Sequence, residues 1–133
     1  MKVVLDTSVL IAAFTTRGLC SELLERVLSD HELIVSPHLL VEFERVLVGK
    51  FGFTAANVKQ AVALLHRVGV IVEPVPLDRP VSRDPDDDLV LALGVQAGAK
   101  CIVTGDRDLL DLERLQSVPI LSPRDFWILE GKR

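Results

Sequence analysis

The chain has little of what several classes of protein require. It contains only two cysteines in 133 residues, Cys20 and Cys101, which lie far apart and in no metal-ligand spacing. Cys101 falls in an apolar run, so we expect a small buried side chain, no disulfide and a reducing compartment. No apolar run approaches the ~20 residues that a membrane-spanning helix needs, and the N-terminus shows no signal-peptide pattern. These absences predict a cytoplasmic protein without membrane contact.

A surplus of basic residues is also missing, because the formal net charge is -4 and the pI is about 5.3. Proteins that coat nucleic acid are usually basic. Any contact with nucleic acid must therefore come from a local basic patch or through bound cations. The three histidines, His31, His38 and His66, occupy no ligand spacing, and no glycine-rich phosphate loop is present. The sequence therefore indicates neither a zinc site nor a nucleotide-binding loop.

What is present suits one compact domain over residues 1–133, with 49% hydrophobic and 26% charged residues. Five apolar segments are typical of buried strands: Lys2–Leu5, Glu32–Val35, Val70–Glu73, Cys101–Thr104 and Pro119–Leu121. They lack in–out alternation, as expected where helices cover both faces of a sheet. The pattern predicts an α/β fold, a three-layer α/β/α sandwich with a mainly parallel sheet of about five strands.

Helix starts are marked by a capping residue followed by proline at residues 36–37, 84–85 and 122–123. The expected helices are His38–Val48, Thr54–Val68, Asp86–Ala97 and a last one through Trp127. A further helix start follows Asp6. Residues 74–80 contain three prolines and read as an extended connector.

Acidic side chains occur on four of these elements, at places where they can meet. Asp6 follows the first strand, and Glu42 lies inside the helix after the second. Asp87 and Asp88 begin the helix after the connector, and the segment containing Asp106 and Asp108 follows a late strand. Ligands gather at the carboxyl edge of a parallel sheet. Several carboxylates without histidine or cysteine favour Mg²⁺ or Mn²⁺, and such an ion suits phosphodiester hydrolysis.

Each acid also has a purely structural interpretation. Asp6 and Asp84 are good helix caps, Asp87 occupies a capping-box-like position, and Asp108 can cap a short turn. Glu42 has apolar neighbours, yet the adjacent Glu44 allows an exposed helix face. No single acid decides the matter. Their placement on four elements favours a shared site.

The motifs that carry these acids resemble those of the PIN-domain ribonuclease family. They are residues 4–10 (VLDTSVL), residues 37–43 (PHLLVEF), residues 84–88 (DPDDD) and residues 103–106 (VTGD). The likeness spans residues 3 to about 126, with the motifs in the family's order. It implies a Mg²⁺- or Mn²⁺-dependent endoribonuclease acting on single-stranded RNA. The closest likeness is to proteins regarded as toxins of toxin–antitoxin pairs.

The resemblance also implies roles for individual residues. Asp6, Glu42 and Asp106 match the family's acids directly. The family's middle acid stands eleven residues before a helix-ending glycine, which selects Asp87 before Gly98, with Asp88 as the alternative. The implied catalytic residues are Asp6, Glu42, Asp87 and Asp106, and the implied metal ligands are Asp6, Asp87, Asp88 and Asp106. Supporting roles fall to Ser8, Thr104 and Asp108, and phosphate contacts to Arg17, Arg83 and Arg107, although Arg107 can equally pair with Asp106 or Asp108.

Apolar side chains near Leu64, Leu65 and Val68, and in residues 126–129, exceed what a small core needs and predict a homodimer or an antitoxin groove. Residues 51–53 (FGF) can stack a base, but packing between helices is the favoured interpretation. Two other functions stay open. One is a catalytically weak PIN-like binding or scaffold protein, which should lack some of the acids. The other is a metal-dependent phosphohydrolase on another substrate, including one that uses Asp6 as nucleophile.

Overall fold

The computed structural model describes residues 1–131, and residues 132 and 133 of the predicted domain lie outside this part. The strands are β1 (Lys2–Leu5), β2 (Glu32–Val35), β3 (Val70–Ile71), β4 (Cys101–Val103), β5 (Arg114–Leu115) and β6 (Val118–Leu121). The helices are α1 (Thr7–Thr15), α2 (Leu19–Asp30), α3 (Pro37–Gly49), α4 (Ala55–Val68), α5 (Pro85–Ala97), α6 (Arg107–Leu110) and α7 (Pro123–Gly131). The described chain is thus an α/β fold.

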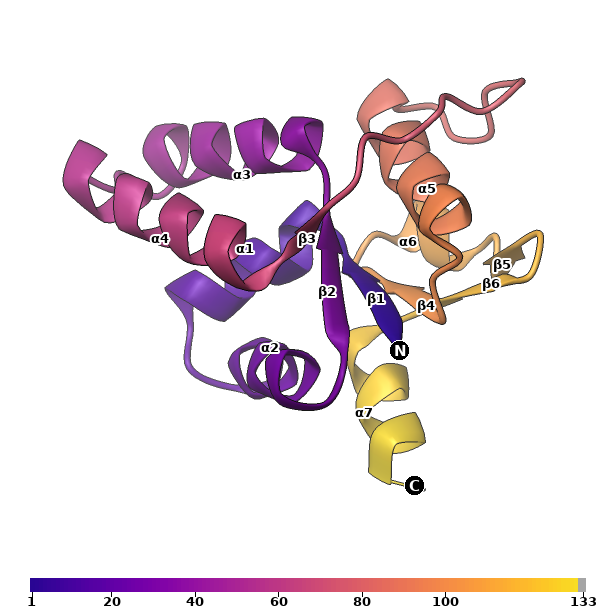
Figure 1. The fold of residues 1–133 in the computed structure, drawn as a ribbon, viewed down its shortest axis with the longest axis horizontal. Coiled ribbons are helices and arrows are strands. Elements are labelled where there is room, and N and C mark those ends of the chain that lie inside the picture. The colour runs from indigo at the N-terminus through magenta and orange to yellow at the C-terminus, as the bar shows by residue number, and fades with distance from the viewer. Residues whose placement is uncertain (132–133) are drawn as a thin grey trace.

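One sheet organises the molecule, with strand order β3-β2-β1-β4-β6-β5. All neighbouring pairs are parallel except β5 and β6. The chain runs outward from β1 to β3 and then returns through α5 to β4, on the other side of β1. Crossovers between parallel strands are right-handed. This reversal therefore places α1 to α4 on one side and α5 on the other, as Figure 1 shows. The predicted three-layer arrangement is confirmed.

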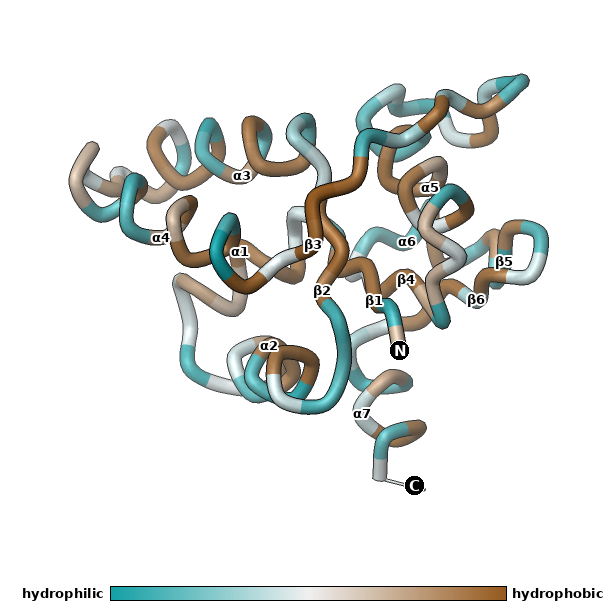
Figure 2. Tube along the Cα trace, viewed as in Figure 1, coloured by the Kyte–Doolittle hydropathy of each residue, from teal (hydrophilic) through white to brown (hydrophobic). Residues whose placement is uncertain are grey.

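The core lies along the central strands, where the side chains of Val3, Val4, Ile34, Ile102 and Val103 are fully buried. Figure 2 shows these strands as almost continuously hydrophobic. Cys101 is buried within the same core and both cysteines are free thiols, as the sequence predicted.

The strand count differs from prediction, because the sheet has six strands rather than about five. The extra strand, β5, has two residues and forms a tight hairpin with β6. Glu113 and Gln116 adopt positive φ angles of 62° and 54° around it. The turn at residues 116–117 contains no glycine, asparagine or aspartate, and β5 itself has no apolar run, so only β6 could be predicted from the sequence. Helix α2 also had no proline or polar cap to mark its start, since Gly18 precedes it.

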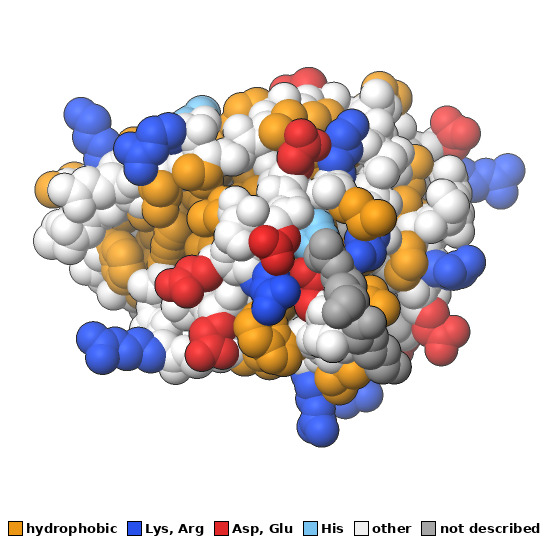
Figure 3. Space-filling model, turned by 60° about the horizontal axis from the view of Figure 1, so that its bottom comes forward, with side chains coloured by type: hydrophobic (Ala, Val, Ile, Leu, Met, Phe, Trp, Pro, Cys, Tyr) orange, Lys and Arg blue, Asp and Glu red, His pale blue; other side chains and the backbone are white. Residues whose placement is uncertain are grey.

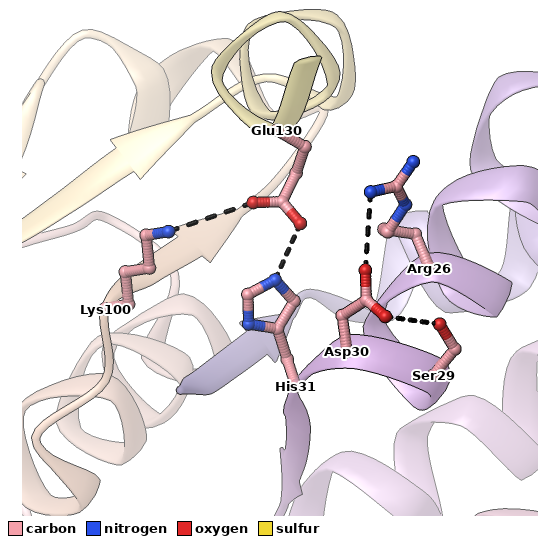
Figure 4. A network of polar contacts seen from close by, with 6 residues as sticks. All are labelled: Arg26, Ser29, Asp30, His31, Lys100 and Glu130. Atoms are coloured by element: carbon pink, nitrogen blue, oxygen red, sulfur yellow. Dashed lines mark hydrogen bonds and ion pairs between the residues drawn. The ribbon is translucent and has the colours of Figure 1, made fainter. Parts of the chain in front are cut away.

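A buried polar cluster fixes α7 to the rest of the domain (Figure 4). Nε2 of His31 lies 2.6 Å from Oε1 of Glu130, and both side chains are 1% exposed. Nζ of Lys100 lies 3.8 Å from the other carboxylate oxygen of Glu130. A buried glutamate needs such partners. The cluster therefore ties α7 to the start of β2 and to the loop before β4.

The surface combines both signs of charge with exposed apolar side chains. On the face drawn in Figure 3, apolar side chains gather toward the end of the molecule that holds α4. Within residues 1–131, no helix has the length and apolar character needed to cross a bilayer.

Gly69 ends α4 at a point where a side chain has no room. A Cβ at this position would lie 2.7 Å from the backbone oxygen of Leu65 and 3.0 Å from Cγ2 of Val35. We expect Gly69→Ala to lower the free energy of unfolding by about 1–3 kcal/mol, the usual cost of overpacking. Gly49→Ala, on α3, is the matched control because a Cβ there meets no atom within 4 Å. Urea denaturation of both variants tests this, and equal stabilities would contradict it.

Candidate active site

Four of the predicted acids line one pocket at the carboxyl edge of the sheet. The pocket has a volume of about 580 Å³, and Asp6, Glu42, Asp87 and Asp106 all contribute to its wall. These residues come from β1–α1, α3, α5 and β4–α6. The edge is also where the direction of strand connection reverses, between β1 and β4, which is the usual position of a ligand site in an open α/β sheet.

Asp6 is held most firmly. Its side chain is buried, and its Oδ1 accepts a hydrogen bond from the backbone N–H of Thr7 at 2.7 Å. Its Oδ2 accepts from the hydroxyl of Thr104 at 2.7 Å and from that of Ser8 at 3.4 Å. Burial raises the pKa of Asp6, while these three hydrogen bonds oppose the rise. Asp6 therefore both caps α1 and presents a fixed carboxylate to the pocket.

Thr104 links the two strand-end acids. Its hydroxyl donates to Asp6 and accepts from the backbone N–H of Asp106 at 3.0 Å. Asp106 in turn caps α6, because its Oδ1 accepts from the N–H of Asp108 at 2.9 Å. The interpretation of Asp108 as the cap is therefore wrong. Helix α6 begins at Arg107, so its capping residue is Asp106, and Asp108 lies inside the helix.

Glu42 reaches the pocket from the middle of α3. Its side chain is 18% exposed, so the interpretation as part of an open helix face is wrong. Burial raises the pKa of Glu42, and the carboxylates of Asp86 and Asp6 add to that rise. Nη2 of Arg45, one turn further along α3, lies 3.8 Å from Oε2 of Glu42.

The structure separates Asp87 from Asp88. Asp87 lines the pocket, and burial together with the charges of Asp106 and Asp6 raises its pKa to about 7. Asp88 turns toward the connector, where its Oδ1 accepts from the backbone N–H groups of Val81 at 3.1 Å and Ser82 at 2.7 Å. Asp84 caps α5 by accepting from the N–H of Asp86, and it also lines the pocket. The cap predicted for Asp84 is confirmed.

The remaining predicted residues lie at the rim or outside it. Ser8 lines the pocket, whereas Asp108 lies outside it and pairs with Arg83 at 3.5 Å. The Arg83 side chain is 89% exposed and so remains accessible. Within residues 1–131, Arg17 and Arg107 form no ion pair.

Sequence reasoning did not assign Lys50 to the site, and for Phe51 it favoured packing between helices over base stacking. Both residues line the pocket just past the end of α3. Nζ of Lys50 lies 5.9 Å from the centre of the Phe51 ring, which is 43% exposed. Phe53 instead packs against the core. The favoured interpretation, packing between helices, therefore holds for Phe53 but not for Phe51. The sequence signal was a basic and an aromatic residue side by side just past a helix end.

The donor set of this pocket fits a hard divalent cation. Its ionisable ligands are carboxylates, which suit Mg²⁺ or Mn²⁺ better than a softer ion. Burial, and then the charges of Asp106 and Asp6, raise the pKa of Asp87, and a bound cation would relieve the repulsion between these charges. Asp6, Asp87, Asp106 and Glu42 all line the pocket and could hold such an ion.

Fold and pocket together define an α/β protein with carboxylates gathered beyond neighbouring parallel strands. The sequence model for the PIN domain matches residues 2–108. The chain therefore belongs to the PIN-domain family, whose members are generally nucleases. No protein of curated function matches the sequence.

Several solved structures share the fold. PAE2754 from Pyrobaculum aerophilum has a TM-score of 0.67 and 16% identity, covering 100% of this chain and 91% of that one. VapBC2 from Rickettsia felis, solved with a DNA fragment from its promoter, has a TM-score of 0.66 and 11% identity, covering 92% and 98%. VapC20 from Mycobacterium tuberculosis, a toxin that cleaves the sarcin–ricin loop, has a TM-score of 0.63 and 16% identity, covering 88% and 98%. At these identities the likeness concerns the fold.

Proposed function

We propose that the protein is a Mg²⁺- or Mn²⁺-dependent endoribonuclease that hydrolyses phosphodiester bonds of single-stranded RNA. The observation that carries this proposal is the convergence of Asp6, Glu42, Asp87 and Asp106 from four elements into one pocket. Membership of the PIN-domain family supports it. The complete set of acids argues against a scaffold protein that has lost its chemistry.

In this function each acid has a distinct part. A divalent cation bound at the carboxylates would neutralise phosphate charge and make water a better nucleophile. The Thr104 hydroxyl fixes Oδ2 of Asp6, and the backbone N–H of Asp108 fixes Oδ1 of Asp106. Asp87 and Glu42 line the same pocket, where they would complete the ligand set or orient the attacking water. Protonation of any of these acids would weaken the binding of the cation.

The phosphohydrolase alternative with Asp6 as covalent nucleophile fits less well. That chemistry often uses a second aspartate two residues after the nucleophile. This chain has Ser8 at that position, where its hydroxyl donates to Asp6 instead. The two functions are separated by incubating the protein with Mn²⁺ and either an internally labelled single-stranded RNA or p-nitrophenyl phosphate. Internal RNA cleavage with little ester hydrolysis is expected, and the reverse preference would contradict the proposal.

Phe51 and Lys50, which line the pocket, could bind the RNA strand next to the acids. An exposed ring offers a stacking surface for a base, and an adjacent ammonium group attracts the phosphate beside it. Arg17, Arg83 and Arg107 are additional candidates for phosphate contacts. The protein thus needs no overall positive charge to bind RNA.

We expect Phe51→Ala to weaken binding of a single-stranded RNA by about fivefold to 150-fold, because stacking of one base contributes ~1–3 kcal/mol. The measurement is fluorescence anisotropy of a labelled oligonucleotide, in an Asp6→Asn background that prevents cleavage. Val48→Ala is the control, because Val48 lies three residues earlier on α3 and is 49% exposed, but lies outside the pocket. Equal RNA affinities for the Phe51 and Val48 variants would contradict a stacking role.

The biological role we propose is that of a toxin paired with an antitoxin protein. The fold is that of solved VapBC toxin–antitoxin proteins, including VapBC-1 from Haemophilus influenzae (TM-score 0.64, 17% identity, covering 93% of this chain and 99% of that one). A groove of about 490 Å³ between α3 and α4, lined by Val48, Val58 and Val62 among others, is a place for an apolar partner segment. Growth arrest on expression, relieved by co-expression of the protein encoded beside it, tests this role.

The predicted homodimer also stays a proposal, and its surface is smaller than expected. Leu65 and Phe126 belong to the core rather than to a surface patch. Val68, Ile128 and Leu129 remain exposed, at 36%, 47% and 40%. Of the apolar residues named here, these three are the ones that could contact a second copy of the chain.

A further inference from the structure

A second group of metal-ligating side chains lies beside the acid pocket. His38 and Glu42 come from α3, one helical turn apart, and Asp86 comes from the first turn of α5. Nε2 of His38 is 2.8 Å from Oδ1 of Asp86. One ligand atom from each of the three residues lies within 4.8 Å of the other two. This grouping corrects the inference that no histidine has a ligand spacing.

The helices bring these three side chains together without the help of a bound ion. Residues at positions i and i+4 of a helix lie on the same face, so α3 presents the imidazole and the carboxylate of Glu42 together. The backbone N–H of Asp86 donates to the capping carboxylate of Asp84, and the Asp86 side chain meets the imidazole of His38. The side chains of His38 and Asp86 are 42% and 36% exposed, so an ion can reach them from solvent.

The guanidinium group of Arg45 is a positive charge close to the two carboxylates of this group. Its Nη2 lies 3.8 Å from Glu42 and 4.0 Å from Asp86, at the outer limit of an ion pair. The Arg45 side chain is 70% exposed, so most of its surface already faces solvent. Exposed pairs of this kind contribute little to stability. The two carboxylates can therefore exchange this partner for a metal ion.

We propose that His38, Glu42 and Asp86 form a second metal site, which binds a first-row transition ion such as Zn²⁺. One imidazole and two carboxylates suit Zn²⁺ better than Mg²⁺, which prefers an all-oxygen shell. Three protein ligands leave a fourth position for water. The site is distinct from the acid pocket in its imidazole, and the two share Glu42.

The shared glutamate couples the second site to the first. An ion held by His38 and Asp86 draws the Glu42 carboxylate away from the pocket that it also lines. This consequence rests on the proposed ribonuclease function. Zn²⁺ at the second site then inhibits RNA cleavage, whereas Mg²⁺ in the acid pocket supports it.

Zinc binding is measured first, without reference to activity, by titrating the full-length protein with Zn²⁺ against a chromogenic chelator. The Asp6→Asn variant is used, so that binding in the acid pocket is weakened. We expect a one-to-one complex, and at least a tenfold loss of affinity in His38→Gln and in Asp86→Asn. His66→Gln, which removes an exposed histidine of α4, is the matched control and should bind as the parent does. Equal affinities for His38→Gln and His66→Gln would overturn the second site.

Cleavage of labelled RNA in Mg²⁺ with added Zn²⁺ then tests the coupling. The wild type and His66→Gln should be inhibited by Zn²⁺, and His38→Gln should require at least tenfold more Zn²⁺ for the same inhibition. Equal inhibition of all three proteins would overturn the coupling. If the wild type cleaves no RNA but zinc affinity still depends on His38, the ribonuclease proposal fails while the metal site stands.

Discussion

Asp6→Asn should lower the rate of RNA cleavage by at least about 10³-fold while leaving the fold intact. The loss is large because a metal ion contributes several kcal/mol to the stabilisation of a charged transition state, and each 1.36 kcal/mol is a factor of ten in rate. Asparagine keeps the shape of the side chain but carries no charge, so it holds a divalent cation poorly. Initial rates on a labelled single-stranded RNA with saturating Mn²⁺ give the measurement.

Asparagine is also a good helix cap, so the variant should fold normally. Its oxygen can still accept the N–H of Thr7, and removal of a buried charge relieves the desolvation that raises the pKa of Asp6. Asp78→Asn is the matched control, because Asp78 is exposed in the connector and lies outside the pocket. Unaltered cleavage by Asp6→Asn, with a normal circular dichroism spectrum, would remove Asp6 from the catalytic set.

Asp87→Ala and Asp88→Ala should change stability in opposite directions, although the two residues are neighbours in one helix. Asp87 has a pKa of about 7 in the folded protein against an ordinary value of 3.8. Between these values the folded state binds more protons than the unfolded state, so this residue makes the metal-free protein less stable as pH rises from about 4 to 7. Asp87→Ala should remove that dependence and raise the melting temperature at pH 8.

Asp88, in contrast, stabilises the folded protein. Its carboxylate accepts from two backbone N–H groups, and Asp88→Ala leaves them without this acceptor. We expect a loss of about 1–3 kcal/mol in the free energy of unfolding, with RNA cleavage retained. Asp87→Ala should instead lose cleavage by at least about 10²-fold. Thermal melts at pH 5 and pH 8 without metal, paired with cleavage assays, measure both effects. An inactive Asp88→Ala beside an active Asp87→Ala would reverse the assignment.

Much of the fold could be predicted because its signals are local. Continuous apolar runs mark strands covered on both faces, and serine or aspartate before proline marks helix starts. The helices after Ser36 and Asp84 begin where these signals place them, and the helix after Thr54 begins after a capping threonine without proline. Strand β5 escaped prediction because two residues of a hairpin carry no periodic pattern, and helix α2 begins after a glycine without a side-chain cap.

The site also has a part that local sequence signals predict and a part that they do not. Asp6 and Asp106 follow buried strands, so their position at the sheet edge follows from the parallel topology. The choice between Asp87 and Asp88 depends on how the connector folds back, since Val81 and Ser82 capture one of the two carboxylates. The contact between His38 and Asp86 joins two helices 48 residues apart in sequence. No local pattern contains that information.

The most direct test of a metal-dependent ribonuclease site is cleavage of an internally labelled single-stranded RNA before and after metal removal. Protein dialysed against EDTA should leave the RNA intact, and addition of Mn²⁺ or Mg²⁺ should restore internal cleavage that Asp106→Asn cannot perform. Internal cleavage by the wild type that persists in excess EDTA, or cleavage by Asp106→Asn at the wild-type rate, would contradict the account.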